Sequence, residues 1–342
     1  MYKSVFRTDG KGGLQRLSEV LAPLQPGMVR VAVRALSLNF RDHYFIRGNR
    51  FRDPIDGRIP MTDAVGIVEE VGDGVTRFAV GDRVCSTVLP HWLDGPLNAA
   101  ALGGSIGSSA ADGVLASHFD ASEHALVSAP AHLSDIEAAT LPVAALTAWH
   151  AVAELGVVHA GDTVVVQTTG GVAVFAMQFA QALGARVIAV SRSAAKLART
   201  EAWATIDSSH LPEWDREVQT LTSNQGARLV LDMGLSDSLR RATRAVAFEG
   251  TVAIIGVVQE HVNPLDIFTV MNKNLNVRGV ETGSRAMFER MNAFLVQRDL
   301  HPHIDAVFDV DHIEAALDRL AASPFGKIVL TLPAHHGKQS WT

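Results

Sequence analysis

The sequence lacks the features that would cross-link the chain or hold it in a membrane. Cys85 is the single cysteine, which excludes an intrachain disulfide and a cysteine-rich zinc site. No uninterrupted apolar run approaches the roughly 18 residues of a membrane-spanning helix, and residues 1–7 lack the apolar core of a secretory signal. We therefore expect a cytoplasmic protein without a membrane segment.

An excess of one charge is also absent. The chain carries 36 acidic and 30 basic residues, a net charge of −6, with no basic block. Neither nucleic acid nor an anionic membrane is therefore an expected partner. A content of 47% hydrophobic and 19% charged residues is typical of a globular protein, and 342 residues predict two domains.

What the sequence does contain is a strand–turn–helix–strand unit in its middle. Thr163–Gln167 is a short apolar run suited to a buried parallel strand. Thr168–Gly171 interrupts that run, and Phe175–Leu183 then shows apolar residues at helical spacing. Arg186–Val190 is a second apolar strand. Together they predict a βαβ unit of about 30 residues.

The glycines of this unit predict a pyrophosphate site. A turn without side chains lets a phosphate reach the unpaired N–H groups at a helix start, and Gly170, Gly171 and the N–H of Val172 are placed to provide them. The dinucleotide-binding pattern is matched imperfectly, with Thr168 and Ala173 at its outer small positions. The alternative is a glycine-rich bend between an unrelated strand and helix, but the βαβ context favours a nucleotide.

The residues after the second strand favour NADP(H) over NAD(H). NAD-preferring sites place an acidic residue there, whereas a 2′-phosphate requires donors or cations. This chain has Ser191, Arg192 and Ser193, with Lys196 one helical turn further on. The alternative is that Arg192 and Lys196 are ordinary solvated charges.

The N-terminal part predicts a compact antiparallel β domain. Met28–Leu38 alternates apolar and polar residues, Val65–Val71 is a further strand, and Val80–Val84 is a tight turn feeding another. Asn39–Tyr44 forms a dense polar and aromatic cluster directly after the first strand. His91–Gly113 shows no stable period and predicts a long loop, either mobile or functional.

Strands and helices continue to alternate after Ser193, which predicts a doubly wound domain over residues 135–282. Residues 1–134 and 283–342 then form the other domain. The further strands are expected at Leu229–Asp232, Gly250–Val257, Asn276–Val280 and Phe325–Leu330. Helices are expected at Ser134–Trp149, Ser236–Val246, Met287–Arg298 and Asp311–Ala322, the last with an aspartate at its N-cap.

Several segments together resemble the medium-chain dehydrogenase/reductase superfamily from end to end. They are the βαβ unit and LSLNFRDHYFIRG (36–48), DAVGIVEEVGDGVTRFAVGDRV (63–84), AATLPVAALTAWHA (138–151) and FGKIVL (325–330). The resemblance is greatest to the zinc-free, quinone-oxidoreductase-like branch. It implies a Rossmann domain, a partly antiparallel GroES-like β-barrel domain, and a homodimer through edge strands at Gly250–Val257 or Asn276–Val280.

The resemblance also predicts that no metal is bound. The positions of the catalytic zinc ligands in zinc alcohol dehydrogenases fall at Asn39, Thr62 and Val143. Val143 cannot bind a metal, Asn39 and Thr62 are poor zinc ligands, and no four-cysteine lobe exists. No histidine pair at ligand spacing stands out. Four histidines are interpreted as surface residues: His301, His303, His335 and His336.

Zinc-free relatives transfer hydride from NADPH to quinones or α,β-unsaturated carbonyl compounds. Their active-site edge falls at Asn39, Arg41, Asp42 and Tyr44. Asn39 or Tyr44 would donate to the carbonyl oxygen and Tyr44 would supply the proton. Arg41 and Asp42 would alternatively form an ion pair that fixes the loop. The other alternative is that the whole cluster only caps a strand end.

For the cofactor, the resemblance implies contacts from both ends of the Rossmann domain. The implied residues are Thr147, Thr169, Gly170, Gly171, Val172, Ser191, Arg192, Lys196, Gly256 and Val257, with Lys327 as a weaker member. The alternative for Thr147 is that it is an ordinary residue of a helix in the protein core. Two departures from the family pattern are Ala173 for the third glycine and Ser208 for a tyrosine that helps hold the adenosine end.

Two other functions stay open. The first is a zinc-independent alcohol or aldehyde oxidoreductase using Tyr44 or His43 as the acid, which is chemically harder because no metal polarises the oxygen. The second is a non-catalytic NADPH-binding protein. Phe40, Phe45 and Trp92 suit a small, flat hydrophobic carbonyl or quinone substrate, although such residues also serve a core.

Overall fold

The structure of the chain is a computed structural model that describes residues 2–49, 53–256 and 263–332. The chain divides into two compact units. The first comprises Met1–Val143 and Ser284–Thr342, and the second comprises Ala144–Gly283. These boundaries lie nine residues and one residue, respectively, beyond those expected at 134/135 and 282/283. Each unit has its own sheet.

The second unit is a doubly wound parallel sheet, as expected. Its strands are β8 (Thr163–Gln167), β9 (Arg186–Ser191), β10 (Ala204–Asp207), β11 (Ala227–Asp232), β12 (Val246–Ile254) and β13 (Asn276–Gly279). They lie in the order β10-β9-β8-β11-β12-β13, and every neighbouring pair is parallel. All five residues of β8 are buried, because helices cover both faces of such a sheet.

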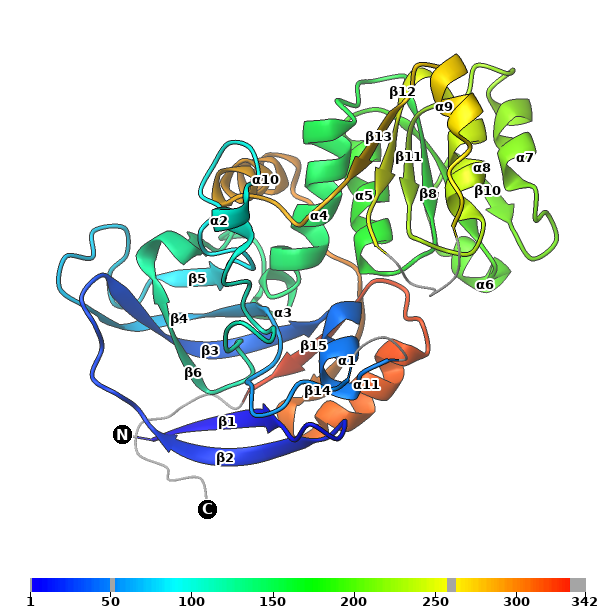
Figure 1. Cartoon of the computed structure of the whole chain (residues 1–342). Helices are drawn as coiled ribbons and strands as arrows, with labels where there is room; N and C mark the ends of the chain where they lie inside the picture. Colours follow the sequence, from blue (N-terminus) through cyan, green and yellow to red (C-terminus); the bar gives the residue numbers. More distant parts are fainter. Residues whose placement is uncertain (1, 50–52, 257–262, 333–342) are drawn as a thin grey trace. The chain divides into compact units, whose positions relative to one another are not determined.

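The helices of this unit are α4 (Leu146–Trp149), α5 (Gly171–Ala182), α6 (Ala194–Leu197), α7 (Trp214–Leu221), α8 (Ser238–Ala245) and α9 (Ile267–Asn272). Helix α5 packs on β8 and β9, and α8 packs on β11 and β12 (Figure 1). Helix α5 begins four residues before the expected Phe175, because extended backbone at Gly170 forms its N-cap. Its buried residues are Ala173, Val174, Phe175, Ala176, Met177, Phe179 and Ala180.

Strand β12 lies inside the sheet and is not an edge strand. The prediction that Gly250–Val257 could pair across a dimer is therefore wrong for this strand. Thr251–Ile254 pair with β11 on one side and β13 on the other, so their backbone groups are already used. Strand β13 pairs with β12 alone among the described residues and is an edge of the sheet. The part of the predicted 250–257 strand at Val257 lies outside the described residues.

The first unit is built on a mainly antiparallel sheet that combines both ends of the chain. Its strands are β1 (Tyr2–Thr8), β2 (Leu14–Val20), β3 (Met28–Leu38), β4 (Asp63–Val71), β5 (Arg83–Ser86), β6 (His118–Ser122), β7 (Leu126–Ser128), β14 (Ile304–Asp309) and β15 (Lys327–Thr331). The seven-stranded sheet has the order β14-β15-β3-β4-β5-β7, with β6 also paired to β3. Figure 1 shows the blue strand β3 beside the red strand β15. Strands β1 and β2 form a separate hairpin.

The first unit includes two helices that the sequence did not predict, α1 (Phe40–Arg47) and α2 (Ala99–Leu102); α2 lies within the expected 91–113 loop. The other helices of this unit are α3 (Asp135–Ala138), α10 (Arg285–Arg298) and α11 (Ile313–Ala321). The polar and aromatic cluster Asn39–Tyr44 therefore forms the N-cap and the first part of a helix, α1. The aspartate expected to cap α11 does not do so: His312 is its N-cap, and Asp309 caps the preceding 3-10 turn by accepting from the N–H of Asp311.

The helix expected over Ser134–Trp149 is broken into segments. It runs as α3, a π-helical turn (Leu141–Ala145) and α4, and a second π-helical turn (His150–Leu155) follows. The first unit ends within this stretch, after Val143.

The segment at 91–113 is packed on the first unit rather than detached from it. Trp92 and Ala101 are buried with Val88 and Leu89. Gly113 donates to Ile59 O at 2.6 Å, and a Cβ at Gly113 would lie 2.0 Å from Met61 O. Only glycine fits so close to the backbone.

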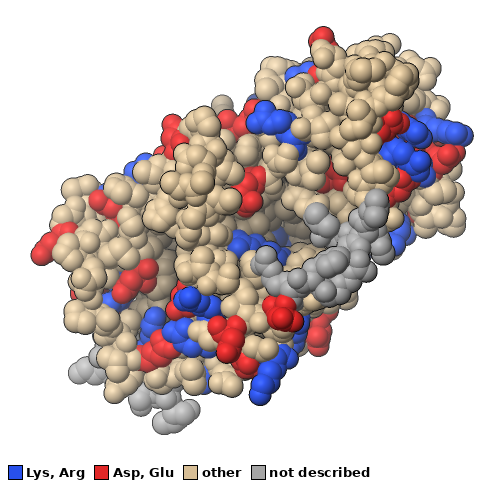
Figure 2. All heavy atoms as spheres, viewed as in Figure 1, with Lys and Arg blue, Asp and Glu red and all other residues tan. Residues whose placement is uncertain are grey.

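No helix among residues 2–49, 53–256 and 263–332 is long and apolar enough to cross a membrane. Figure 2 shows acidic and basic side chains interspersed over the visible face, with no broad area of one sign. The distribution on this face agrees with the small net charge.

Candidate functional site

A buried polar cluster lies at the end of β3 in the first unit. The antiparallel registers pair Leu38 with Ile328 and Ser37 with Asp63, so β15 and β4 flank the end of β3. Lys327 Nζ donates to Leu38 O at 2.7 Å and to Asn39 Oδ1 at 2.6 Å, and lies 3.7 Å from Asp63 Oδ2. A lysine, an aspartate and an asparagine from three strand ends thus meet.

The cluster places opposite charges out of contact with water. The side chain of Lys327 is 3% exposed and that of Asp63 is fully buried. Burial lowers the pKa of Lys327, and the charge of Asp63 opposes that shift. Burial raises the pKa of Asp63, and the positive charge of Lys327 is the largest effect that opposes this shift. Each charge is therefore tolerated inside the protein mainly because the other is present.

Asp42 adds a second buried carboxyl next to this pair. It lies in the first turn of α1, where its Oδ2 accepts from the backbone N–H of Asn39 at 2.8 Å. Its Oδ1 is buried without a hydrogen-bond partner among the described residues. Burial raises the pKa of Asp42 to about 7; Arg41 opposes the shift and Asp63 adds to it. Asp42 therefore titrates near neutral pH.

The three positions that correspond to zinc ligands do not fit a metal. All three surround Asp63: Thr62 Oγ1 donates to Asp63 Oδ1 at 2.8 Å, and the Val143 N–H points to Oδ2 at 3.4 Å. At the third position, the Oδ1 of Asn39 accepts a hydrogen bond from the ammonium of Lys327. A cation there repels a metal ion, a hydroxyl that donates is a poor ligand, and valine offers none.

The remaining predicted catalytic residues, Arg41 and Tyr44, lie apart from the Lys327 contacts. No ion pair joins Arg41 to Asp42 in the part of the chain that the structure describes, which corrects the ion-pair alternative. The Arg41 guanidinium instead donates to Ser105 Oγ at 3.3 Å and stacks on Phe45 at 5.1 Å. The ring of Tyr44 packs edge-on against Phe40, with centroids 4.8 Å apart. Both are partly exposed, whereas Asp42 faces the interior.

The turn between β8 and α5 in the second unit leaves open space at the start of a helix. Thr168 has φ of +66°, and Gly170 is the extended N-cap of α5. A Cβ at Gly170 would meet nothing within 4 Å, so the space in front of the helix is open. The first N–H groups of a twelve-residue helix face this space, and they bind anions.

Two buried polar side chains without complete partners lie beside this turn. Val166 pairs with Leu231, so Gln167 and Asp232 follow at the ends of the neighbouring strands β8 and β11. Both polar atoms of Gln167 and the Oδ2 of Asp232 lack hydrogen bonds among the described residues. Burial raises the pKa of Asp232. The strand order reverses between β8 and β11, and α/β sheets bind dinucleotides at the carboxyl ends of the strands at such a point. The polar atoms of Gln167 and Asp232 that lack hydrogen bonds would therefore fit a bound cofactor.

The end of β9 presents charges of both signs. Arg192 is exposed and forms no ion pair with any residue the structure describes. Lys196 lies in α6, whose N-cap Ser193 accepts from the Lys196 N–H. Opposite Ser191, in register, lies Asp207, whose pKa is lowered by hydrogen bonds from Ser209. The sequence analysis did not identify this acid, because it lies on a different strand.

The other predicted cofactor residues are divided between the units. Thr147 is buried in α4, and Gly256 follows β12 with open space around it. Val257 lies outside the described residues. Lys327 belongs to the first unit, where its hydrogen bonds go to Leu38 and Asn39.

Comparison with known proteins finds similarity along the whole chain. The alcohol dehydrogenase GroES-like domain family matches residues 25–131, and the zinc-binding dehydrogenase family matches residues 171–297. The zinc-type alcohol dehydrogenase-like protein of Schizosaccharomyces pombe is 35% identical over 327 residues, which cover 92% of this chain and 93% of that protein.

Solved structures agree with this similarity. The structure of a Sinorhizobium meliloti protein assigned as an alcohol dehydrogenase is 34% identical, with a TM-score of 0.90 over 96% of this chain and 98% of its own. A structure described as an NAD-dependent alcohol dehydrogenase is 29% identical, with a TM-score of 0.84 over 97% and 99% of the two chains.

Proposed function

Because the chain belongs to the medium-chain dehydrogenase/reductase superfamily, we propose that it is an NADPH-dependent reductase of quinones or α,β-unsaturated carbonyl compounds that acts without a metal. The superfamily makes it a nicotinamide-dependent, alcohol dehydrogenase-like oxidoreductase. The choice of substrate class, cofactor and metal-free mechanism is our proposal. The observation that carries it is the hydrogen bond between Lys327 and Asn39 at a zinc-ligand position.

That hydrogen bond determines what Asn39 does. An ammonium only donates, so the atom of Asn39 at 2.6 Å must be the amide oxygen. The Nδ2 group is then the donor end of the side chain. It lowers the pKa of Asp63 but forms no hydrogen bond of standard geometry. Nδ2 is buried in the free protein; we propose that it becomes accessible when substrate binds and then donates to the substrate's carbonyl oxygen, where negative charge grows during reduction.

The reaction balances with these groups. When bound, the nicotinamide supplies a hydride. The hydride forms a C–H bond at the β carbon, and the π electrons of the C=C bond move to the carbonyl oxygen as an enolate. Asn39 donates to that oxygen, and the positive charge of Lys327 behind the amide stabilises it. The Tyr44 hydroxyl then delivers a proton to the α carbon and recovers one from water.

The second unit supports NADPH with one opposing feature. Gly170, Gly171 and Val172 would hold the pyrophosphate, with Gln167 and Asp232 below them. Arg192, Lys196 and Ser191 would hold the 2′-phosphate. Asp207 lies in register with Ser191, and its charge opposes a phosphate there. A relative of known structure is described as NAD-dependent, so NADH is the competing cofactor.

The test is turnover by metal-free protein. After chelator treatment, NADPH oxidation is followed with naphthoquinone, a linear enone, an aldehyde and no acceptor. We expect turnover with the quinone or the enone. Asn39→Ala should lower kcat by about 10- to 100-fold, at or somewhat below the usual loss for one oxyanion donor. Asn292→Ala is the matched control, because Asn292 is a half-buried asparagine on α10 whose Nδ2 donates to Ser128 O and which is not among the proposed site residues.

Other outcomes favour the other candidates. The names of the relatives favour an alcohol or aldehyde oxidoreductase; oxidation of alcohols by the metal-free protein, with no enone turnover, would select it. NADPH binding without turnover of any acceptor would leave a non-catalytic NADPH-binding protein.

We also propose a homodimer formed by pairing of β13 strands at Asn276–Gly279. An exposed edge strand is a template for another chain. Light scattering should give twice the chain mass of 36.6 kDa, and Val277→Pro should give the monomer, because proline removes a backbone donor. A monomeric mass for the unmodified protein refutes this assembly.

A further inference from the structure

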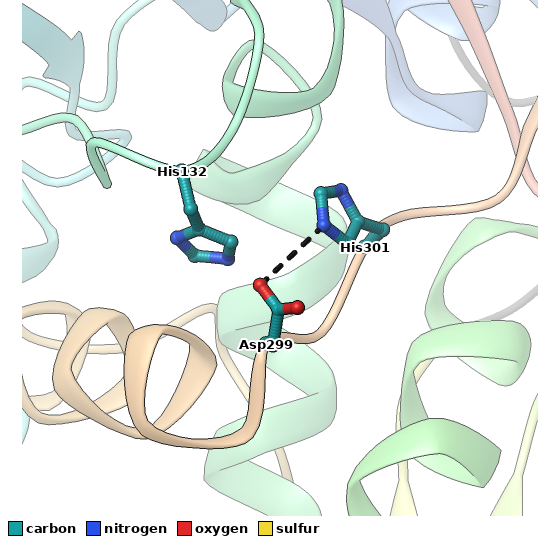
Figure 3. Close-up of side chains that lie close together, drawn as sticks. All are labelled: His132, Asp299 and His301. Atoms are coloured by element: carbon teal, nitrogen blue, oxygen red, sulfur yellow. Dashed lines mark ion pairs between the residues drawn. The ribbon is translucent and has the colours of Figure 1, made fainter.

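Three side chains that can bind a metal meet in the first unit, at the end of α10. His132 lies between β7 and α3, and Asp299 and His301 follow α10. One ligand atom of each lies within 4.8 Å of the other two. Figure 3 shows the two imidazole rings and the carboxylate turned toward a common point, with the Asp299–His301 contact dashed. None of the three belongs to the proposed catalytic or cofactor residues.

A carboxylate outside the cluster fixes the orientation of His301. The Nδ1 of His301 lies 2.6 Å from Glu137 Oε1. The other oxygen of Glu137 accepts from the N–H and hydroxyl of Ser134 at 2.8 and 2.7 Å, so the carboxylate cannot turn away. His301 therefore carries its proton on Nδ1 and directs Nε2 to Asp299 Oδ1, 3.7 Å away. Metal-bound histidines are held by a carboxylate in the same manner.

The fold also holds the second imidazole in place. The Nε2 of His132 lies 3.3 Å from Leu300 O, the carbonyl between Asp299 and His301; to bind zinc through Nε2, His132 would release the Nε2 proton and give up this contact. The rings of His132 and His301 meet edge-on with centroids 5.4 Å apart. His132 is half-buried and its Nδ1 has no hydrogen-bond partner among the described residues. The segment before α3 and the segment after α10 thus present two imidazoles to one carboxylate.

We propose that His132, Asp299 and His301 bind one Zn²⁺ ion, with water as the fourth ligand. Two imidazoles and a carboxylate are a donor set that zinc accepts. Bonds of about 2.0–2.1 Å place tetrahedral ligands about 3.3 Å apart, close to the 3.7 Å between His301 and Asp299. Small side-chain rotations close the remaining separation. The ion joins two segments that are about 170 residues apart in sequence, and its role is structural.

Zinc titration of tag-free, chelator-treated protein tests the site. By calorimetry with zinc chloride alone, we expect one ion per chain. His132→Gln and His301→Gln should each weaken binding at least 10-fold, the lower end of the loss for a disrupted metal site. His159→Gln is the matched control, because His159 is an exposed histidine 3.9 Å from an aspartate, Asp162. The double variant His335→Gln, His336→Gln controls for binding by the C-terminal histidines.

A second readout separates a metal site from a merely structural histidine cluster. Zinc should raise the Tm of the unmodified protein and leave that of His301→Gln unchanged, because only a ligand that binds the folded state stabilises it. Glu137→Gln should weaken zinc binding by roughly 10- to 100-fold. Absence of saturable binding, or binding that survives His132→Gln or His301→Gln, overturns the proposal. The result is independent of whether quinones or enones are substrates.

Discussion

Replacing Asp42 by asparagine should remove a pH-dependent loss of stability. Asp42 is fully buried, and its pKa is raised from 3.8 to about 7. Above neutral pH the native state must therefore hold a second buried carboxylate next to Asp63, and the positive charge of Arg41 offsets only part of that cost. Asparagine retains an oxygen that accepts from the Asn39 N–H and never carries the charge. The stability of the variant relative to that of the unmodified protein should therefore increase steadily from pH 5 to pH 8.

The magnitude follows from the two pKa values. Because the folded pKa lies above the unfolded one, the native state binds the proton more tightly, and stability falls as pH rises from about 4 to about 7. The shift from 3.8 to about 7 corresponds to about 4 kcal/mol over the full range. Between pH 5 and pH 8 the same shift gives a loss of about 2 to 3 kcal/mol. Above pH 8 no further loss from Asp42 is expected.

Urea unfolding at several pH values measures this difference. The free energy of unfolding of Asp42→Asn minus that of the unmodified protein should rise by about 2 to 3 kcal/mol from pH 5 to pH 8. Asp318→Asn, which removes an exposed carboxyl of α11, is the control and should give a flat difference. A flat difference for Asp42→Asn as well would refute the burial argument, since it would mean that Asp42 titrates at its ordinary pKa.

Three further predictions follow from the two sites. Lys327→Met leaves Asp63 charged and unpaired and should lower stability by about 3 to 5 kcal/mol; adding Asp63→Asn should recover part of the loss, and a double variant as unstable as the single one contradicts the pairing. Arg192→Asp should weaken NADPH binding by roughly 10- to 100-fold and leave NADH binding unchanged; an equal effect on both cofactors contradicts the 2′-phosphate assignment. Gly170→Val should fold normally, because its Cβ meets nothing within 4 Å, yet lose NADPH binding in a fluorescence titration; unchanged binding means that the pyrophosphate lies elsewhere.

Local patterns were enough to predict the parallel sheet. The apolar run at Thr163–Gln167 and the helical spacing of the apolar residues that follow depend only on neighbouring residues; the strand appears where expected, and the helix begins four residues earlier than expected. Helix α1 also had a local signal that was missed. Asn39 and Asp42 stand three residues apart, as in a capping box, but with aspartate in place of glutamate at the third position.

The candidate sites depend on strand pairing that no local pattern reveals. Asn39 and Lys327 are 288 residues apart in sequence, and only the antiparallel register of β15, β3 and β4 brings both to Asp63. His132 meets His301 because α10 contacts β7; His301 is exposed, as the sequence predicted, but its contact with His132 was not predictable from either residue's neighbours. Gln167 and Asp232 each close an otherwise apolar strand, which is a readable signal, but their pairing depends on β8 and β11 being neighbours.

The most direct test of the proposed function is to trace the hydride in chelator-treated protein. NADPH deuterated at the reactive C4 position is mixed with a linear enone under anaerobic conditions, and the product is analysed by mass spectrometry and NMR. The account predicts deuterium at the β carbon, with a rate that added zinc does not raise. Turnover that appears only when zinc is restored, or deuterium on the carbonyl carbon, would contradict a metal-free enone reductase.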